Sequence, residues 1–204
     1  MYIFRNTFSS GRKFIFPKFA TDEKQRDVGQ HITKTEMNEK IWFEMIDRKY
    51  GEIYLSKYIS FQRALKKTFT ILTLLISVSG ILGWKYFENY AWIAFILISI
   101  MQLFTLIENQ LIRSEKEVEE ISNLRMMYTK YFHKLEQLYT EFYFNRITEE
   151  NATNQFFELR KTDWEKIEEL DCKLDIKRFN RLMNKTDIET NQYFNKYHNY
   201  EQRT

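Results

Sequence analysis

Two long apolar stretches dominate the hydrophobic pattern of this 204-residue chain. The first covers residues 68–84 and the second residues 89–107, with Lys85 and Glu88 in the short segment between them. Neither stretch contains an ionised side chain, and each approaches the roughly 20 residues that a helix needs to cross hydrocarbon. A buried helix of a soluble protein normally carries polar residues every three or four positions. The pattern therefore predicts a transmembrane hairpin over residues 68–107.

Helical periodicity is also visible before the first apolar stretch. A helix is expected from Thr33, with Thr33 or Thr35 as its N-cap, and Gly51 is expected to interrupt it. A second helix, residues 53–84, then runs into the first span. The apolar faces of these two helices are predicted at Met37, Ile41 and Met45, and at Leu55, Tyr58, Ile59, Gln62 and Leu65.

The second span is predicted to continue beyond the membrane as one helix from Asn89 to about Phe144, because no Pro or Gly follows Gly83. Its apolar stripe consists of Ile121, Leu124, Tyr128, Tyr131, Leu135, Leu138 and Phe142. Steps of three and four are typical of a coiled coil between copies and of packing within one chain. A step of three on either side of Ile121 breaks strict register, so packing within the chain is favoured.

The remainder of the chain is predicted to be helical as well. After a turn at residues 145–151, Thr148 is expected to open a helix, and two shorter helices are expected at residues 178–183 and 187–197. The inward positions of the first of these three helices are Phe156, Leu159, Ile167, Leu170 and Leu174. One proline and five glycines in the whole chain favour long uninterrupted helices.

These elements predict an all-α fold, in which a transmembrane helical hairpin continues into long cytosolic helices that form a bundle. The chain then divides into an N-terminal arm at 1–32, cytosolic helices at 33–67, the hairpin at 68–107, and a stalk helix with C-terminal helices at 108–204. A cleavable signal peptide is not visible in residues 1–20, so the hairpin itself is expected to direct insertion.

Basic residues flank the hairpin and predict its orientation. Arg63, Lys66 and Lys67 precede the first span and Arg113 follows the second, whereas Lys85 in the turn is balanced by Glu88. By the positive-inside rule both termini are cytosolic. A bacterial inner membrane is the simplest location for such a two-span protein.

The N-terminal arm is rich in basic and aromatic residues. Residues 1–67 hold 14 Lys and Arg against 8 Asp and Glu, and Arg12, Lys13 and Lys18 alternate with phenylalanines. Such a segment is attracted to anionic lipid headgroups. It is also typical of a surface that contacts nucleic-acid phosphates and stacks on bases, or that docks a protein partner.

Catalytic motifs are lacking. The sequence has no phosphate-binding glycine loop, nucleophile elbow or metal-ligand spacing, so we expect neither an enzyme nor a bound cofactor or metal. A single cysteine, Cys172, excludes an intramolecular disulfide and is expected to be an ordinary buried thiol.

Polar residues within the two apolar stretches are the candidate functional residues, because polar groups are costly in hydrocarbon. Each set lies on one helix face: Thr70, Thr73, Ser77 and Gly80 in the first span, and Ser99, Gln102 and Thr105 in the second. In a tight hairpin, positions whose numbers add up to about 175 lie opposite each other. Charges at the membrane entry are Lys66, Lys67, Glu108 and Arg113. The polar faces either pack the hairpin closely or line a water-filled path in an oligomer.

The layout resembles that of a known group of proteins. A cytosolic helix at residues 34–49, two spans joined by a minimal turn and a long helix leaving the membrane are similar to the two-transmembrane effectors of bacterial anti-phage defence of the SLATT type, which occur beside nucleotide-signalling enzymes or retrons. The resemblance covers the architecture of residues 35–200. It implies an effector that a regulatory protein or sensor holds silent until a signal arrives.

The function expected from the resemblance is a toxin-like one. The effector would oligomerise, form a pore or otherwise depolarise the inner membrane, and arrest growth of the infected cell. Two alternatives remain open: a membrane-anchored adaptor whose hairpin is an inert tether, and a nucleic-acid tether that uses residues 1–34.

Overall fold

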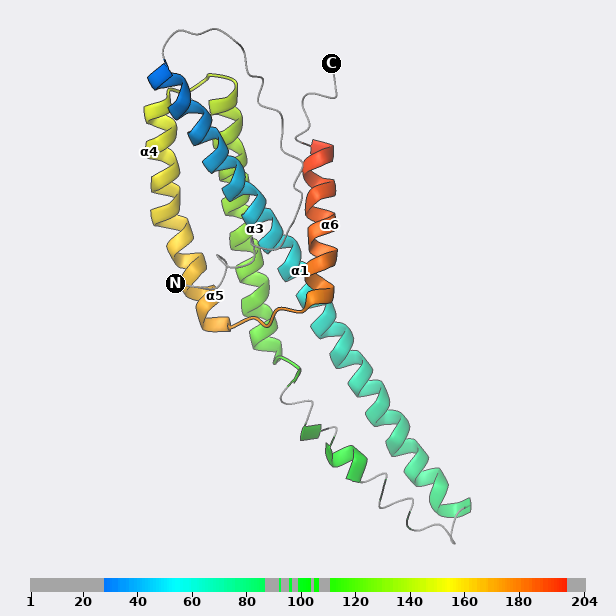
Figure 1. Ribbon diagram of the computed structural model, residues 1–204. Helices are drawn as coiled ribbons and strands as arrows, with labels where there is room; N and C mark the ends of the chain where they lie inside the picture. The colour runs from blue at the N-terminus through cyan, green and yellow to red at the C-terminus, as the bar shows by residue number, and fades with distance from the viewer. Residues whose placement is uncertain are drawn as a thin grey trace. The chain divides into compact units, whose positions relative to one another are not determined.

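The computed structural model describes residues 28–86, 92, 96, 99–103, 105, 106 and 111–197, with side chains described from residue 34 on and not for residues 77–86. Its regular structure in these residues is entirely helical, which confirms the predicted all-α class (Figure 1). The elements are α1 (Val28–Tyr86), α3 (Glu115–Tyr143), α4 (Glu149–Leu159), a π-helix η3 (Arg160–Trp164), α5 (Glu165–Leu174) and α6 (Asn180–Tyr197). They form two compact units: the described residues up to Ser56 with those from Ser122 on, here called the bundle unit, and the described residues from Lys57 to Ile121, here called the apolar unit.

The core of the bundle unit follows the predicted apolar stripes. Met37, Ile41 and Met45 of α1 are buried, and so is every member of the α3 stripe from Leu124 to Phe142. Because this burial occurs within one chain, the α3 stripe packs on neighbouring helices of the same molecule, as predicted. Trp42 of α1 contacts both Tyr139 of α3 and Phe194 of α6, with ring centroids 5.3 and 5.1 Å apart.

Gly51 does not interrupt the first helix, contrary to the prediction. Helix α1 is continuous from Val28 to Tyr86, so the expected start with a cap at Thr33 or Thr35 is also wrong. A Cβ atom added to Gly51 would lie 2.5 Å from Cε1 and 2.8 Å from Cδ1 of Tyr128. The glycine therefore serves the packing of a fully buried tyrosine ring against the α1 backbone, which outweighs its poor helix propensity.

Helix α3 begins at Glu115, so the predicted uninterrupted helix from Asn89 to Phe144 is wrong. Residues 112–114 are not helical. Ser114 Oγ accepts a hydrogen bond from the Glu117 amide at 3.2 Å, and Glu117 Oε2 accepts one from the Ser114 amide at 2.9 Å. This reciprocal arrangement is a capping box, which starts a new helix by satisfying its first amides.

The C-terminal half of the bundle unit confirms part of the prediction. Thr148 caps α4, its Oγ1 accepting from the Asn151 amide at 3.4 Å. Phe156, Ile167 and Leu174 are buried, whereas Leu159 and Leu170 are half-buried. The helix is interrupted by the π-helical turn η3, and Cys172 on α5 is exposed rather than buried. The expected burial of that thiol was wrong because Cys172 lies off the face that carries Ile167 and Leu174.

A single helix, α6, replaces the two short helices predicted at residues 178–183 and 187–197. Thr186, Thr190 and Phe194 form one buried stripe at four-residue spacing, which continues through the predicted break. The Thr186 hydroxyl donates to the Leu182 carbonyl at 2.8 Å, so it is satisfied inside the helix. Tyr54 of α1 holds the loop between α5 and α6 by two hydrogen bonds. Its hydroxyl donates to the Lys177 carbonyl at 2.7 Å and accepts from the Phe179 amide at 3.1 Å.

Replacing Gly51 by alanine should destabilise the protein, although alanine favours a helix interior by about 1 kcal/mol over glycine. The overlap with Tyr128 forces a packed core to shift, which costs about 1–3 kcal/mol. We expect a lower Tm for Gly51→Ala in thermal unfolding of the full-length protein followed by circular dichroism. In a Tyr128→Leu background the same change should raise Tm. An increase in Tm for Gly51→Ala alone would contradict this account.

Candidate functional site

The apolar unit exposes an unusual amount of hydrophobic surface. Every described residue from Lys66 to Leu75 on α1 is exposed except Phe69, so the helix has no side on which its apolar residues are covered. Leu74 and Leu75 are 59% and 60% exposed. The exposed large apolar residues of this unit, here called the apolar face, are Ile71, Leu72, Leu74, Leu75, Trp92, Ile96, Ile100, Leu103, Leu106 and Leu111.

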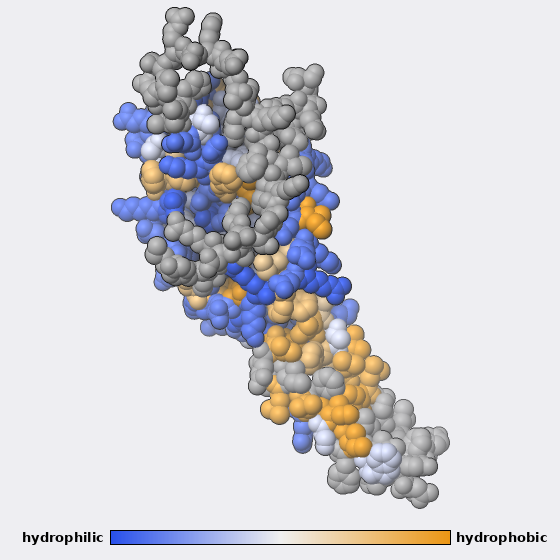
Figure 2. Space-filling view, in the orientation of Figure 1, coloured by the Kyte–Doolittle hydropathy of each residue, from blue (hydrophilic) through white to orange (hydrophobic). Residues whose placement is uncertain are grey.

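Figure 2 shows an orange, apolar area over the exposed stretch of α1. Contiguous apolar patches of this kind mark protein or membrane interaction sites, whereas single exposed apolar residues are ordinary. Within the ranges that the structure describes, no helix combines the length and apolar character needed to span a bilayer.

Two predicted site residues beside the apolar face, Thr70 and Thr105, are satisfied within their own helices. Thr70 Oγ1 donates to the Lys66 carbonyl and Thr105 Oγ1 to the Met101 carbonyl, each at 3.0 Å. Gln102 is exposed, as are the neighbouring Leu103 and Leu106. The hydroxyl protons of Thr70 and Thr105 are thus used locally, so the predicted pairing of these two residues across the hairpin stays a prediction.

A network of polar side chains lies at the end of the apolar unit that carries Tyr58 and Arg113. Gln62, which is buried, donates to the Tyr58 hydroxyl at 3.1 Å and accepts from the Arg113 amide at 3.2 Å. Gln62 and Arg113 have numbers that add up to about 175, the value expected for opposite positions in the hairpin. Lys66 and Glu115 form an ion pair of 2.6 Å across the same two segments.

Charge pairing in this network shifts the pKa of its groups. Burial lowers the pKa of Arg113, but hydrogen bonds with Glu117 and the Tyr58 phenol outweigh it and raise the pKa overall. The Arg113 guanidinium and the Ser114 amide lower the pKa of Glu117. The predicted entry charge Arg113 is therefore half-buried and paired at 2.8 Å with Glu117, whereas Lys67 is exposed.

Several predicted site residues lie outside what the structure describes. The side chain of Ser77 and the position of Gly80 in the packing belong to this group, as do Glu108 and the N-terminal Arg12, Lys13 and Lys18. Thr73 and Ser99 are described and exposed. The roles proposed from sequence for all of these residues stay predictions.

The bundle unit contains a buried cation that sequence reasoning missed. Arg48 of α1 is 5% exposed. Its Nε and Nη2 donate to Glu44 Oε1 at 2.9 and 2.5 Å, and its Nη1 lies 3.0 Å from Asp47 Oδ2. The guanidinium carbon stacks 3.4 Å from the ring centroid of Trp164, at the end of η3. Burial lowers the pKa of Arg48, yet the charges of Glu44 and Asp47 raise it above its usual value.

A carboxyl group on α5 completes this ionic cluster. Burial raises the pKa of Asp171 to about 6, although the charges of Arg178 and Arg48 act to lower it, and Glu168 adds a smaller upward effect. Desolvation also raises the pKa of Tyr128, which lies in the same region. In the described part of the chain, no group of three or more His, Cys, Asp or Glu side chains is arranged to hold a metal ion.

A sequence signal for the cluster existed. Arg48 follows Met45 by three positions and Ile41 by seven, so it occupies the buried stripe of its helix. A charged residue at such a position is rarely buried unless it is paired. Trp164 could not be foreseen as its partner, because the π-helical turn that places the indole leaves no mark in the apolar spacing.

Comparison with known proteins finds no match: no family model, no curated protein and no solved structure is similar to this chain. The geometry above is therefore the basis for proposing a function.

Asp171 predicts a pH dependence of stability. The pKa of Asp171 is about 6 in the folded state, against a value near 3.8 in the unfolded state. Between these two pH values the folded state binds more protons than the unfolded state, so stability falls as pH rises from about 4 to about 6. Ionised Asp171 thus costs on the order of 3 kcal/mol at neutral pH.

The measurement compares Tm of the wild type and Asp171→Asn over this pH range. The wild type should have the lower Tm of the two at neutral pH, and the difference in Tm should shrink as pH falls. Asn154→Gln changes an exposed side chain of α4 that does not ionise and serves as the control, with a constant difference. A constant difference for Asp171→Asn as well would refute the assignment.

Proposed function

We propose that the chain is a two-span membrane protein of a bacterial inner membrane, whose hairpin at residues 68–107 acts on the bilayer and whose bundle unit receives the regulatory signal. The observation that supports this most strongly is the exposure of α1 on every side between Lys66 and Leu75. In water, each half-exposed leucine there forgoes about 1 kcal/mol of burial. In hydrocarbon the same surface is favourable.

The polar contacts of the apolar unit also suit this proposal. Gln62, Arg113 and the Lys66–Glu115 ion pair lie on the N-terminal side of the α1 apolar residues, where an interface with water would be. Beyond Lys67, the hydroxyls of Thr68 and Thr70 donate to carbonyls of their own helix. In lipid, a polar group needs a hydrogen-bond partner within the protein, because no water is available there.

The activity we propose is that of an effector: when a partner or signal releases it, the protein oligomerises and depolarises the membrane, which arrests growth of the infected cell. Gln102 is the residue on which this rests. An exposed amide on an apolar helix is costly in hydrocarbon unless it meets another polar group or water. Association of several copies through Gln102 would provide either.

Membrane potential measured with a voltage-sensitive dye during induced expression tests this activity. Wild type should depolarise the cells, and Gln102→Leu or Gly80→Leu should return the signal to that of uninduced cells at equal membrane abundance. The control Gln155→Leu also replaces a glutamine by leucine, at an exposed position of α4, and should depolarise the cells as wild type does. Equal depolarisation by wild type and Gln102→Leu would exclude the polar face from the mechanism.

A second function, that of a membrane-anchored adaptor, is favoured by the threonine hydrogen bonds. Because the hydroxyls of Thr70 and Thr105 are satisfied within their own helices, the polar face needs neither a pore nor a partner helix. On this proposal the hairpin is a tether and the bundle unit recruits a cytosolic protein or nucleic-acid complex.

Replacement of residues 68–84 and 89–107 by unrelated apolar helices separates the two functions. An adaptor keeps its biological activity after this exchange, measured as protection of cells against phage, whereas an effector that acts through its hairpin loses it. Membrane abundance of the exchanged protein, measured by immunoblotting of membrane fractions, must equal that of wild type.

A further inference from the structure

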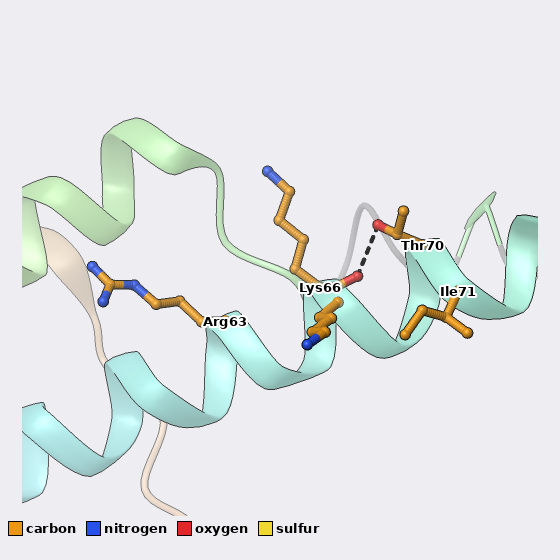
Figure 3. Close-up of a pocket in the computed structure, with 5 residues that line it drawn as sticks. Arg63, Lys66, Thr70 and Ile71 are labelled. Carbon is orange, nitrogen blue, oxygen red and sulfur yellow. Dashed lines mark hydrogen bonds between the residues drawn. The ribbon is translucent and has the colours of Figure 1, made fainter.

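Helix α1 carries a basic groove directly before its exposed apolar residues. The groove has a volume of about 350 Å³ and is lined by Arg63, Lys66, Lys67, Thr70 and Ile71. These positions are three or four residues apart, so they share one side of the helix over two turns. Figure 3 shows Arg63 extending toward the N-terminal side of α1, away from Thr70 and Ile71.

The charge of the groove is positive. Its lining contains three cations and no carboxylate. Lys66 is paired at 2.6 Å with Glu115, which holds the pKa of that carboxyl below its usual range. Among the residues that the structure describes, Arg63 and Lys67 have no ion-pair partner. An anion in the groove would therefore meet two cations that no carboxylate of the described residues neutralises.

The hydroxyl of Thr70 restricts how such an anion is held. Its proton is donated to the Lys66 carbonyl, as the dashed line in Figure 3 shows, so Thr70 offers only an acceptor to the groove. Binding of an anion must therefore come from Arg63 and Lys67, with Lys66 shared with Glu115. The methylene stems of these side chains remain available for apolar contact.

The groove continues into an apolar surface, which identifies the ligand more closely than charge alone. Ile71 lines the groove and is 46% exposed, and Leu74 and Leu75 follow within about one turn of α1. A ligand that matches both parts has an anionic head and an apolar tail. Helical side chains point toward the N-terminus, so the charged ends of the basic side chains lie toward the N-terminal end of the groove and the apolar residues lie toward its C-terminal end.

We propose that Arg63 and Lys67 bind the phosphate of an anionic phospholipid, with its acyl chains along Ile71 and the leucines that follow. The proposal rests on membrane residence of the apolar unit. Phosphatidylglycerol fits the groove better than phosphatidylcholine, since the choline cation of the latter is repelled by the same side chains. The bound lipid would fix the depth at which α1 enters the bilayer.

The test uses full-length protein reconstituted in phosphatidylcholine bilayers that contain a trace of spin-labelled phosphatidylglycerol or spin-labelled phosphatidylcholine. Electron paramagnetic resonance measures the fraction of each label immobilised by the protein. Wild type should prefer phosphatidylglycerol, and Arg63→Gln/Lys67→Gln should lose about fivefold or more of that preference. Arg181→Gln/Lys185→Gln removes one Arg and one Lys with the same spacing from exposed positions of α6 and should retain it.

The outcomes separate this proposal from the proposed function. If the protein is extracted from the bilayers by alkaline carbonate, membrane residence fails and the lipid site fails with it. If the protein stays in the bilayers but Arg63→Gln/Lys67→Gln keeps the wild-type preference, the lipid site alone is refuted. If wild type stays in the bilayers but immobilises both spin labels equally, while inorganic phosphate binds to it and not to Arg63→Gln/Lys67→Gln, the groove takes free phosphate and the assignment to a lipid is overturned.

Discussion

The bundle unit depends on keeping one buried cation paired. Moving a guanidinium out of water costs several kcal/mol unless its charge and its N–H groups are compensated. Glu44 and Asp47, on the same face of the same helix, provide that compensation for Arg48 at 2.5 and 3.0 Å. Arg48 thus belongs to the core of the bundle while remaining charged, and the helices around it must leave room for its two carboxylates.

The π-helical turn η3 carries the aromatic partner of this cation. A regular helix from Glu149 to Leu174 would keep its 3.6-residue period, whereas the turn at Arg160–Trp164 adds a local change in phase. As a result Trp164 stacks on Arg48 at 3.4 Å and contacts Tyr128 edge-on, with ring centroids 5.9 Å apart. The aromatic face adds a cation–π contact to the two ion pairs of Arg48. The same Tyr128 occupies the space that Gly51 provides.

The bundle unit buries its apolar side chains, whereas the apolar unit exposes them. Only some features of the two units could be predicted from the sequence. Apolar spacing was enough to predict the buried faces of α1 and α3, and the Thr148 cap was readable because a threonine precedes two glutamates. Gly51 misled the prediction because its local propensity and its packing role point in opposite directions. The capping box at Ser114 and Glu117 was readable in principle, but the lack of Pro and Gly suggested continuity. The groove on α1 could not be predicted, since the sequence does not show which of its cations pairs with a carboxylate such as Glu115.

The exposure of Cys172 has a practical consequence. It is the one thiol in the chain and lies on the outer side of α5, opposite to Ile167 and Leu174. A maleimide dye would therefore attach at a single known position without any engineered cysteine. Because α5 also carries Asp171 in the adjoining position, the emission of such a dye would report changes of hydration beside the ionic cluster.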